Sequence, residues 1–444
     1  MPESALNSGD TAWILTSAAL VLLMLPGLAL FYGGMTRAKS TLNMIMMVFG
    51  ALCVVGVIWI LYGYSMTFGA DTGAGLIASP LELFGLDGLM ADDPEAAYPV
   101  MAFVAFQAMF AAITVALIAG AIADRAKFGA WLVFGAIWAT IVYFPVAHWV
   151  WGTGGWIFEG LGPLNGVPAI DFAGGTAVHI NAGAAALALA IVLGRRLGWP
   201  NTPMKPHNMT LVMIGAGLLW FGWFGFNAGS ALAAGNTSAV VFVNTFGATC
   251  AAALGWLLVE KVRDGHATSL GAASGIVAGL VAITPSCSAV SPVGALVLGA
   301  VAGVLCALAV GLKYRFAYDD SLDVVGVHLV GGLVGTLLIG FLATEAAPAG
   351  VNGLFNGGGP EQLKSQAIAA FVVMFYSLVL ALIIGKLIAV TMGFRVSEDD
   401  EIAGIDRIIH AEGAYELTES GAGGRFAGVG SAAAARSGKR EGSA

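Results

Sequence analysis

Three histidines fall inside apolar stretches of the sequence, where an ionisable side chain is costly and is therefore a candidate for function. They are His148, His179 and His328. His148 lies in PVAHWVWG, at the expected outer end of its stretch, and we interpret it as a histidine that a neighbouring helix satisfies. That structural role is also the alternative to a functional role for the other two.

His179 and His328 differ from His148 in their expected depth. His179 follows Asp171 by eight residues, so at 1.5 Å per helical residue it lies about 12 Å inside the membrane. His328 follows Asp319 by nine residues and enters from the opposite side to about 13 Å. Both imidazoles therefore approach the midplane of a hydrocarbon core about 30 Å thick. A neutral imidazole has one donor and one acceptor, so the pair can bond each other, bind a small amine or pass a proton.

Aromatic residues form the second group of candidates. FQAMF places Phe106 and Phe110 four residues apart on one helix face, Trp151 follows in HWVWG, and GFNAGS supplies Phe226 and Ser230. Aromatic faces and a hydroxyl group can hold a small cation by cation–π attraction and one hydrogen bond. Aromatic residues in membrane helices also serve as packing and as interfacial anchors. The spacing alone does not choose between these interpretations.

Two aspartates precede the deep histidines. Asp171 opens DFAGG and is predicted to cap the helix that carries His179, and its charge would also favour a cation at the outer mouth. Asp323 is expected to belong to a buried network on the cytoplasmic side. The histidine pair has no third ligand and the cysteines lack a metal-type spacing, so neither a metal site nor another cofactor is expected.

Membrane helices are the elements that must position these residues. Of the 444 residues, 58% are hydrophobic and 10% are charged, against about 25% charged in a soluble domain. This composition predicts an all-α integral membrane protein in a lipid bilayer, because a span needs about 20 apolar residues. Eleven stretches qualify as transmembrane helices: 13–35, 41–64, 99–123, 128–150, 172–194, 208–231, 239–259, 267–287, 292–312, 324–343 and 366–391.

The basic residues predict the orientation of these spans. One set of connecting loops holds eleven Lys and Arg residues, and the opposite set holds only Lys364. Because basic loops remain in the cytoplasm, the N-terminus is expected outside and the C-terminus inside. The opening MPESALNSGD has no basic region, so the run from Trp13 to Met35 is interpreted as the first span and not as a removed leader.

Spans 1–5 and 6–10 are predicted to form a 5+5 inverted repeat, followed by a final helix. ALFYGGM from Ala29 corresponds to GFNAGSA from Gly225, and DFAGGTAVHINAG from Asp171 corresponds to DVVGVHLVGG from Asp323. Five spans per half invert the second half relative to the first, and transporters of this plan place their path between the repeats.

Several long motifs in this order identify a family. They are PGLALFYGGM, FQAMFAAITVALIAGAIADR, AHWVWG, DFAGGTAVHINAG, WFGFNAGSA, GLVAITP and DVVGVHLVGG. The chain resembles the ammonium transporters of the Amt/Mep/Rh superfamily, specifically the bacterial Amt branch, from about Asp10 to Tyr415. This resemblance implies a homotrimer with one pore in each subunit. It also implies an external ammonium-recruiting site formed by Phe106, Trp151 and Ser230 and supported by Asp171.

The resemblance implies further roles along the path. Phe110 and Phe226 would form a gate of stacked rings, and His179 and His328 would be the twin pore histidines. Thr284 matches a threonine that lines the outer part of the path. The segment PSCSAVSP that follows Thr284 departs from relatives, which often have a glycine and an aromatic residue there, so the outer mouth is expected to differ.

The resemblance and the composition together divide the chain into three regions. Residues 1–395 are expected to form the transport domain, and 396–420 a cytoplasmic tail that couples subunits. A PII-type nitrogen regulatory protein is the expected partner at that face, and no nucleic acid is expected. Residues 421–444 are rich in Gly, Ala and Ser and are expected to be disordered.

The predicted function is transport of ammonium or ammonia across the inner (plasma) membrane of the cell, with no enzymatic activity. Ammonium would lose a proton below the recruiting site, and ammonia would pass the histidine pair. The sequence leaves open whether the proton crosses separately. An ammonium sensor of the same fold and an Rh-type gas channel are the alternatives.

Overall fold

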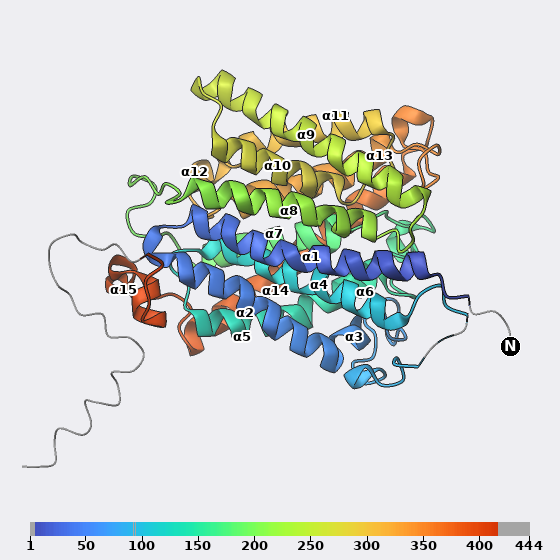
Figure 1. Ribbon diagram of the computed structural model, residues 1–444, viewed down its shortest axis with the longest axis horizontal. Helices are drawn as coiled ribbons and strands as arrows, with labels where there is room; N and C mark the ends of the chain where they lie inside the picture. The colour runs from blue at the N-terminus through green and yellow to red at the C-terminus, as the bar shows by residue number, and fades with distance from the viewer. Residues whose placement is uncertain (1–4, 92, 94, 416–444) are drawn as a thin grey trace, which may run out of the picture.

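The computed structural model describes residues 5–91, 93 and 95–415. Within these ranges the chain is helical, and strand-like pairing is limited to isolated bridges. The helices lie side by side in one bundle, with the start of α1 at one end and α15 at the other (Figure 1). We call the end where α1 begins the outer end and the end that carries α15 the inner end, after the predicted orientation.

In the first half, two long spans are each interrupted midway by a π-helical turn. The helices of this half are α1 (Ser8–Met35), α2 (Thr41–Ile58), α3 (Tyr64–Phe68), α4 (Val100–Ile118), α5 (Phe128–Trp138), α6 (Phe144–Trp151) and α7 (Asn181–Leu193). The π-helical turns that join α2 to α3, join α5 to α6 and precede α7 are Trp59–Gly63, Ala139–Tyr143 and Gly175–Ile180.

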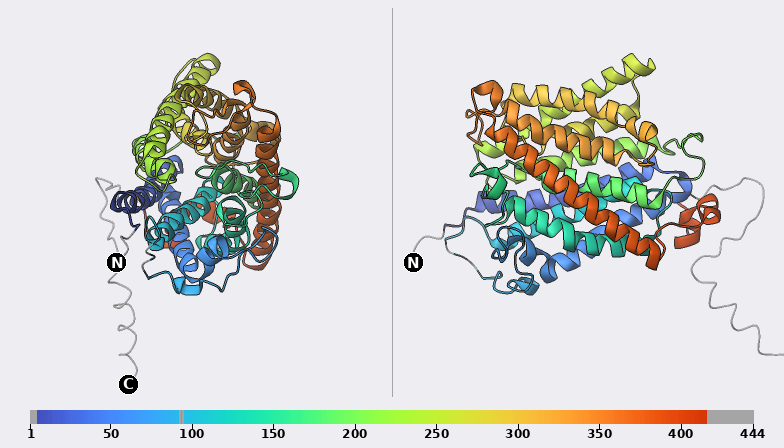
Figure 2. Two further views of the ribbon diagram at one scale, coloured as in Figure 1. Left: turned by 90° about the vertical axis from the view of Figure 1, so that its right-hand side faces the viewer. Right: turned by 180° about the vertical axis from the view of Figure 1, so that it is seen from behind.

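The second half also has a π-helical turn before its histidine-bearing helix, and a long final helix follows it. The elements from here to the tail are α8 (Met209–Gly229), α9 (Asn236–Asp264), α10 (Ser269–Ile283), α11 (Pro292–Ala309), α12 (Leu312–Phe316), a π-helical turn (Val325–Leu329), α13 (Val330–Leu342), α14 (Glu361–Thr391) and α15 (Glu398–Ala403). Viewed along the bundle, the two halves lie beside each other (Figure 2, left). Viewed from the side, α14 crosses the outside of the bundle diagonally (Figure 2, right).

Ten helical segments of the described chain are long and apolar enough to cross a membrane. The eleventh predicted stretch, 267–287, contains α10, which has 15 residues and stops at Ile283. Pro285 contributes to the early stop, because it has no backbone N–H to donate to the preceding turn of α10. Each predicted stretch thus corresponds to a helix, and the bounds differ by a few residues.

Local signals in the sequence fix where several helices begin. The Asn7 side chain accepts hydrogen bonds from the N–H groups of Gly9 and Asp10 at the start of α1. Thr268 and Ser291 accept in the same way at the starts of α10 and α11. These caps satisfy N–H groups that the first helical turn leaves unpaired.

Glycine lets the helix that carries His179 approach the segment that carries His328. A Cβ atom on Gly183 of α7 would lie only 2.5 Å from the backbone nitrogen of Leu329. Any larger residue would therefore push the two segments apart, as expected where small residues mediate helix contacts in lipid.

Charged residues tie the connecting loops together at the inner end. The buried Asp124 carboxylate lies 3.2 Å from Arg37 and 3.4 Å from Arg196, and Arg196 also pairs with Asp319 at 2.8 Å. Glu401 of α15 accepts from Arg37 at 3.5 Å. The segment that follows the last span is thereby attached to loops of the first half.

A second contact attaches the same tail to α2. The Asp406 carboxylate accepts hydrogen bonds from the backbone N–H groups of Leu42 and Asn43, at 2.9 and 2.8 Å. Tyr415 reaches His207, with 2.8 Å between the hydroxyl group and Nε2. The described part of the predicted tail 396–420 is therefore docked on the inner end, whereas the predicted extension 421–444 lies outside the described residues.

Candidate functional site

Two buried histidines meet inside the bundle, each delivered by a π-helical turn. Their Nδ1 atoms lie 3.3 Å apart, and the ring centroids are 5.3 Å apart. His179 is 1% exposed and His328 is 3% exposed, so water does not surround either ring. One Nδ1 must donate and the other must accept, which makes the two tautomers complementary. π-Helical turns occur frequently at functional sites.

An aspartate cap begins each histidine-bearing segment. Asp171 accepts from the N–H groups of Gly174, Gly175 and Thr176 at 2.6–2.8 Å, and it also bonds the Thr176 hydroxyl group. These bonds pair the backbone N–H groups at the start of the segment, which would otherwise lack acceptors. His179 lies about two helical turns after Asp171. The predicted capping role of Asp171 is thus present in the structure.

The equivalent cap in the second half is Asp320, which the sequence reasoning missed. Asp320 accepts from the N–H groups of Val324 and Val325 at 3.1 and 2.7 Å. Burial raises its pKa to about 6. Asp323, the expected counterpart of Asp171, instead pairs with Lys313 at 2.7 Å and remains partly exposed. The spacing in the sequence could have identified Asp320 as the cap, because Asp171 and Asp320 each precede their histidine by eight residues.

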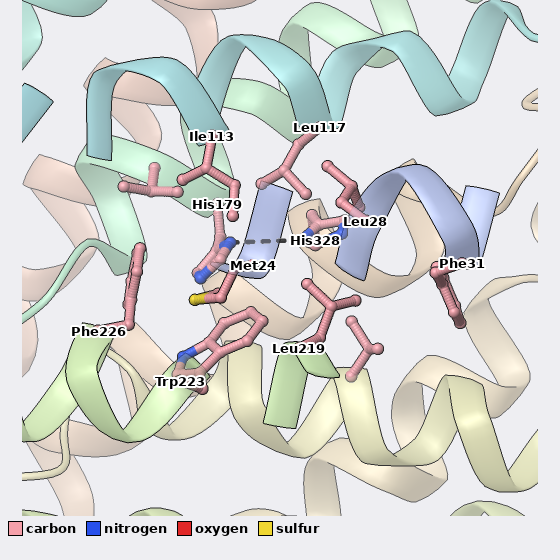
Figure 3. Close-up of a pocket in the computed structure, with 12 residues that line it drawn as sticks. Met24, Leu28, Phe31, Ile113, Leu117, His179, Leu219, Trp223, Phe226 and His328 are labelled. Carbon is pink, nitrogen blue, oxygen red and sulfur yellow. Dashed lines mark hydrogen bonds between the residues drawn. The ribbon is translucent and has the colours of Figure 1, made fainter. Parts of the chain in front are cut away.

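The cavity beside the histidine pair is small and apolar. Its volume of about 10 Å³ holds roughly one water-sized molecule. Figure 3 shows His179 and His328 on its wall together with aliphatic and aromatic side chains. The residues that line it are Met24, Leu28, Phe31, Ile113, Leu117, Val178, His179, Leu219, Trp223, Phe226, Val277 and His328.

Trp223 is a site residue that sequence reasoning did not single out. Its ring lies nearly parallel to His179, with centroids 5.4 Å apart and an angle of 22°. Its indole N–H donates to the Thr284 hydroxyl group at 2.8 Å. Thr284 is itself buried and is not among the residues that line the small cavity. The structure therefore places Thr284 behind Trp223, where its hydroxyl group orients the indole.

A stacked pair of phenylalanines separates the histidines from the outer end. Phe110 and Phe226 lie 4.1 Å apart at 15°, and Phe226 lies 6.2 Å from His179 between ring centroids. Both rings are 1% exposed. Since the two rings are stacked, they leave no gap between Phe110 and Phe226 in this conformation.

The predicted recruiting residues continue this row of rings outward. Phe106 lies 4.8 Å from Phe110, and Trp151 meets Phe110 edge-on at 5.9 Å between centroids. The Trp151 indole N–H donates to the Asp171 carbonyl oxygen at 2.9 Å, which fixes the ring on the Asp171 turn. The Ser230 hydroxyl group donates to the Phe226 carbonyl oxygen at 2.8 Å and keeps oxygen lone pairs free to accept.

His148 has the structural role expected of it. It is fully buried, its Nδ1 lies 2.9 Å from the Thr67 carbonyl oxygen, and its Nε2 lies 3.3 Å from Asp71. It therefore links α6 to the loop that follows α3. The backbone N–H of Gly75 holds the pKa of Asp71 below its usual value, and the hydrogen bond from His148 acts in the same direction.

The fold and the site together define a multi-pass helical membrane protein with a buried histidine pair beside a small apolar cavity. The family model described as Ammonium Transporter Family matches residues 12–415. The chain is 59% identical over 434 residues to an ammonium transporter of Mycobacterium tuberculosis, covering 93% of this chain and 91% of the relative. It is 45% identical over 417 residues to one of Aquifex aeolicus, covering 94% and 95%.

Solved structures agree with this relationship. Mep2 of Saccharomyces cerevisiae matches with a TM-score of 0.79 at 33% identity, covering 88% of this chain and 91% of Mep2. A sensor Amt protein matches with a TM-score of 0.82 at 28% identity, covering 90% and 97%. The chain therefore belongs to the ammonium transporter family.

Proposed function

We propose that this protein transports ammonium across the cell inner membrane by carrying its nitrogen past His179 and His328 as ammonia. The observation that carries the proposal is the buried histidine pair in a dry cavity that has room for about one small molecule. Neutral ammonia fits this site, since it can donate to one imidazole nitrogen and accept from another.

The free energy of desolvation argues that the proton leaves before the nitrogen passes the gate. Moving a compact cation from water into a medium of low dielectric constant costs of order 20 kcal/mol in the idealised case. A cation–π contact returns only about 0.5–2 kcal/mol. Aromatic rings can therefore select and concentrate ammonium at the mouth, but they cannot carry the charge through. Potassium has no proton to lose, so the same path rejects it.

The outer row of aromatic residues is assigned to recruitment. Phe106, Trp151 and Ser230 would hold ammonium at the mouth, with Asp171 fixing Trp151. Phe110 and Phe226 would then form the gate below. Trp151→Leu or Ser230→Ala should weaken the apparent affinity for ammonium several-fold. A conservative change at Phe224, which stacks on Phe242 outside this row, is the matched control.

The arrangement in the membrane is part of the same proposal. Ten long spans and the shorter α10 would make eleven crossings, with the N-terminus outside and α15 in the cytoplasm. The docked tail 396–420 would couple the subunits of a homotrimer and offer a surface to a PII-type protein. Two inverted halves of five spans within residues 1–395 are supported by the equivalent caps, Asp171 and Asp320.

Flux measurements on the purified protein test the proposal. Liposomes that contain the protein should show ammonium-driven flux, and the same gradient of potassium should produce none. A protein that binds ammonium at the outer site but conducts nothing would be a sensor, as one solved relative is described. Flux that saturates as the ammonium concentration is raised would indicate a recruiting transporter. Flux that keeps rising in proportion to the concentration would indicate an unselective Rh-type gas channel.

A further inference from the structure

Two open grooves meet at the inner end of the bundle, on the side that α14 crosses (Figure 2). The first has a volume of about 500 Å³ and runs between α7 and α14, with walls that include Val192, Leu382 and Ile383. The second, of about 490 Å³, lies beside it, and Ile191 lines both. Volumes of about 300–1,000 Å³ are typical of sites that bind small molecules.

The first groove contains a cation without a protein partner. Lys386 lines it, five residues before the end of α14, which is about 7.5 Å from the end of the helix. No hydrogen bond or ion pair joins Lys386 to any residue in the described ranges. The close contact of α14 with α7 at Gly385, where a Cβ atom would lie 2.7 Å from Leu189, holds this part of the groove in place.

The second groove adds an exposed guanidinium group. Arg195 lines it and donates through Nε to the Ala317 carbonyl oxygen at 3.1 Å, so its position is fixed. Asp319 is the carboxylate on the wall of this groove, and both of its oxygens already accept from Arg196 at 2.8–2.9 Å. Within the described chain, Arg195 forms no ion pair, so the two grooves carry a net positive charge.

We propose that these grooves bind one anionic phospholipid, with its phosphate group between Lys386 and Arg195 and an acyl chain along the apolar wall between α7 and α14. The apolar walls match the chain and the two cations match the phosphate group. On the predicted orientation the grooves open toward the cytoplasmic leaflet, which is rich in anionic lipids. Packing a second copy of this chain there would bury two unpaired cations, which is strongly unfavourable. The proposal depends on the membrane location and not on the transport mechanism.

Native mass spectrometry of the purified full-length protein tests the site directly. The protein in detergent is titrated with palmitoyl-oleoyl phosphatidylglycerol and, separately, with the phosphatidylcholine of the same chains. Each basic residue near a membrane surface contributes about a fivefold change in binding. We therefore expect phosphatidylglycerol to bind more tightly, by about 25-fold at most.

Three variants separate the head group from the chain. Lys386→Leu and Arg195→Gln should each reduce the preference for phosphatidylglycerol about fivefold, because the choline cation of phosphatidylcholine already offsets the charge of its phosphate group. Ile191→Trp fills the place where the grooves meet and should weaken both lipids. Lys261→Gln is the control, because Lys261 is an exposed basic residue of α9 that lines neither groove. Its lipid preference should match the wild type.

Two results would overturn the proposal. One is equal binding of the two lipids by the wild type, or a preference that survives in the Lys386→Leu/Arg195→Gln double variant. The other is a change in the number of chains per particle in Ile191→Trp while lipid binding stays constant, which would assign the grooves to contact between copies. Since Lys386, Arg195 and Ile191 are exposed, their replacement leaves the core intact, and an unchanged unfolding temperature checks this.

Discussion

At the scale of single residues, the contact between His179 and His328 determines what the path can offer to a small amine. If His179 donates through Nδ1, its Nε2 carries a free lone pair, and His328 carries its own proton on Nε2. The Nε2 of His179 is buried and has no protein partner. One free acceptor and one free donor therefore flank the pair, which suits a molecule that both donates and accepts hydrogen bonds.

The histidine pair gives the sharpest functional prediction. His179→Ala or His328→Ala removes one partner and leaves the other buried imidazole unpaired, which costs about 1–3 kcal/mol. Ammonium-driven current in liposomes should fall at least tenfold, and potassium current should appear once the cavity is wider and wetter. His179→Glu should retain some ammonium current, since it can still exchange a proton.

A matched control exists at the inner end. His266→Ala changes an exposed histidine in the loop after α9 and should leave both currents unchanged. Wild-type ammonium current and selectivity in the double alanine variant would reduce His179 and His328 to packing residues.

The Asp320 cap can be separated from the neighbouring Asp323. Asp320→Ala removes the acceptor for two N–H groups at the start of the His328 segment and should destabilise the fold by about 1 kcal/mol. Asp323→Ala removes the ion pair with the buried Lys313, which keeps the Asp320 carbonyl oxygen as an acceptor at 3.1 Å, so this change should cost less. Thermal unfolding of the two variants in one detergent measures the difference. An equal loss of stability would remove the parallel between Asp320 and Asp171.

The sequence predicted the meeting of His179 and His328 because depth follows from helical rise and the distance to a helix end. It could not predict Trp223, because an indole within WFGWFGF looks like any packing residue until its partner Thr284 is in place. The repeat was aligned on Asp323 because DVVGVH, like DFAGGTAVH, has an aspartate followed by a histidine. The alignment failed there because a cap depends on where the turn begins and not on which aspartate is nearer.

At the scale of elements, the Asp71 carboxylate ties the loop after α3 to α6. Asp71 accepts from the N–H groups of Gly73 and Gly75 and contacts His148 of α6. Its pKa is lowered, so its stabilising contribution is complete above about pH 4, the usual Asp value, and is lost as the pH falls through the lowered pKa. This loop should therefore loosen in acid before the bundle unfolds.

Thermal unfolding as a function of pH tests this contact. The difference between the wild type and Asp71→Asn should be largest near pH 6 and should shrink as the pH is lowered to about 3. Glu95→Gln, in the exposed part of the same connection, is the control and should show no such trend. A difference that stays constant with pH would mean that the Asp71 charge does not hold the loop.

The predicted spans match helices because their apolar runs are long, but the sequence did not indicate the π-helical turns within them. Such a turn inserts one residue without changing composition. A hydropathy pattern therefore does not register it. Pro285 in the sequence does indicate that α10 ends near Ile283.

At the scale of the whole molecule, the tail that follows the last span, α14, contacts loops and helices of the first half. Asp406 accepts hydrogen bonds from backbone N–H groups at the start of α2, and Glu401 pairs with Arg395. These contacts hold the tail against the bundle. Asp406→Ala should expose the tail to limited proteolysis without unfolding the bundle, whereas Asp399→Ala, at an exposed position in α15, should not. Equal cleavage of the two variants would show that Asp406 does not secure the tail.

The transport consequence of the same contact is a separate prediction. Deleting residues from Gly404 onward should reduce or deregulate ammonium flux while oligomers persist, because the residues of the proposed path, such as His179 and His328, all lie upstream. Trimming only residues 421–444 should leave flux unchanged. Flux assays on the two truncated proteins distinguish these outcomes, and loss of flux on the shorter deletion would contradict the assignment of 421–444 as dispensable.

The stacked phenylalanines also bear on how fast any path through this bundle can operate. If the proposed path runs between Phe110 and Phe226, passage depends on how often a ring rotates aside, because the two rings are in contact. Throughput should then follow an activation barrier set by the packing around two benzyl groups. Throughput should therefore rise steeply with temperature, because ring rotation is an activated step.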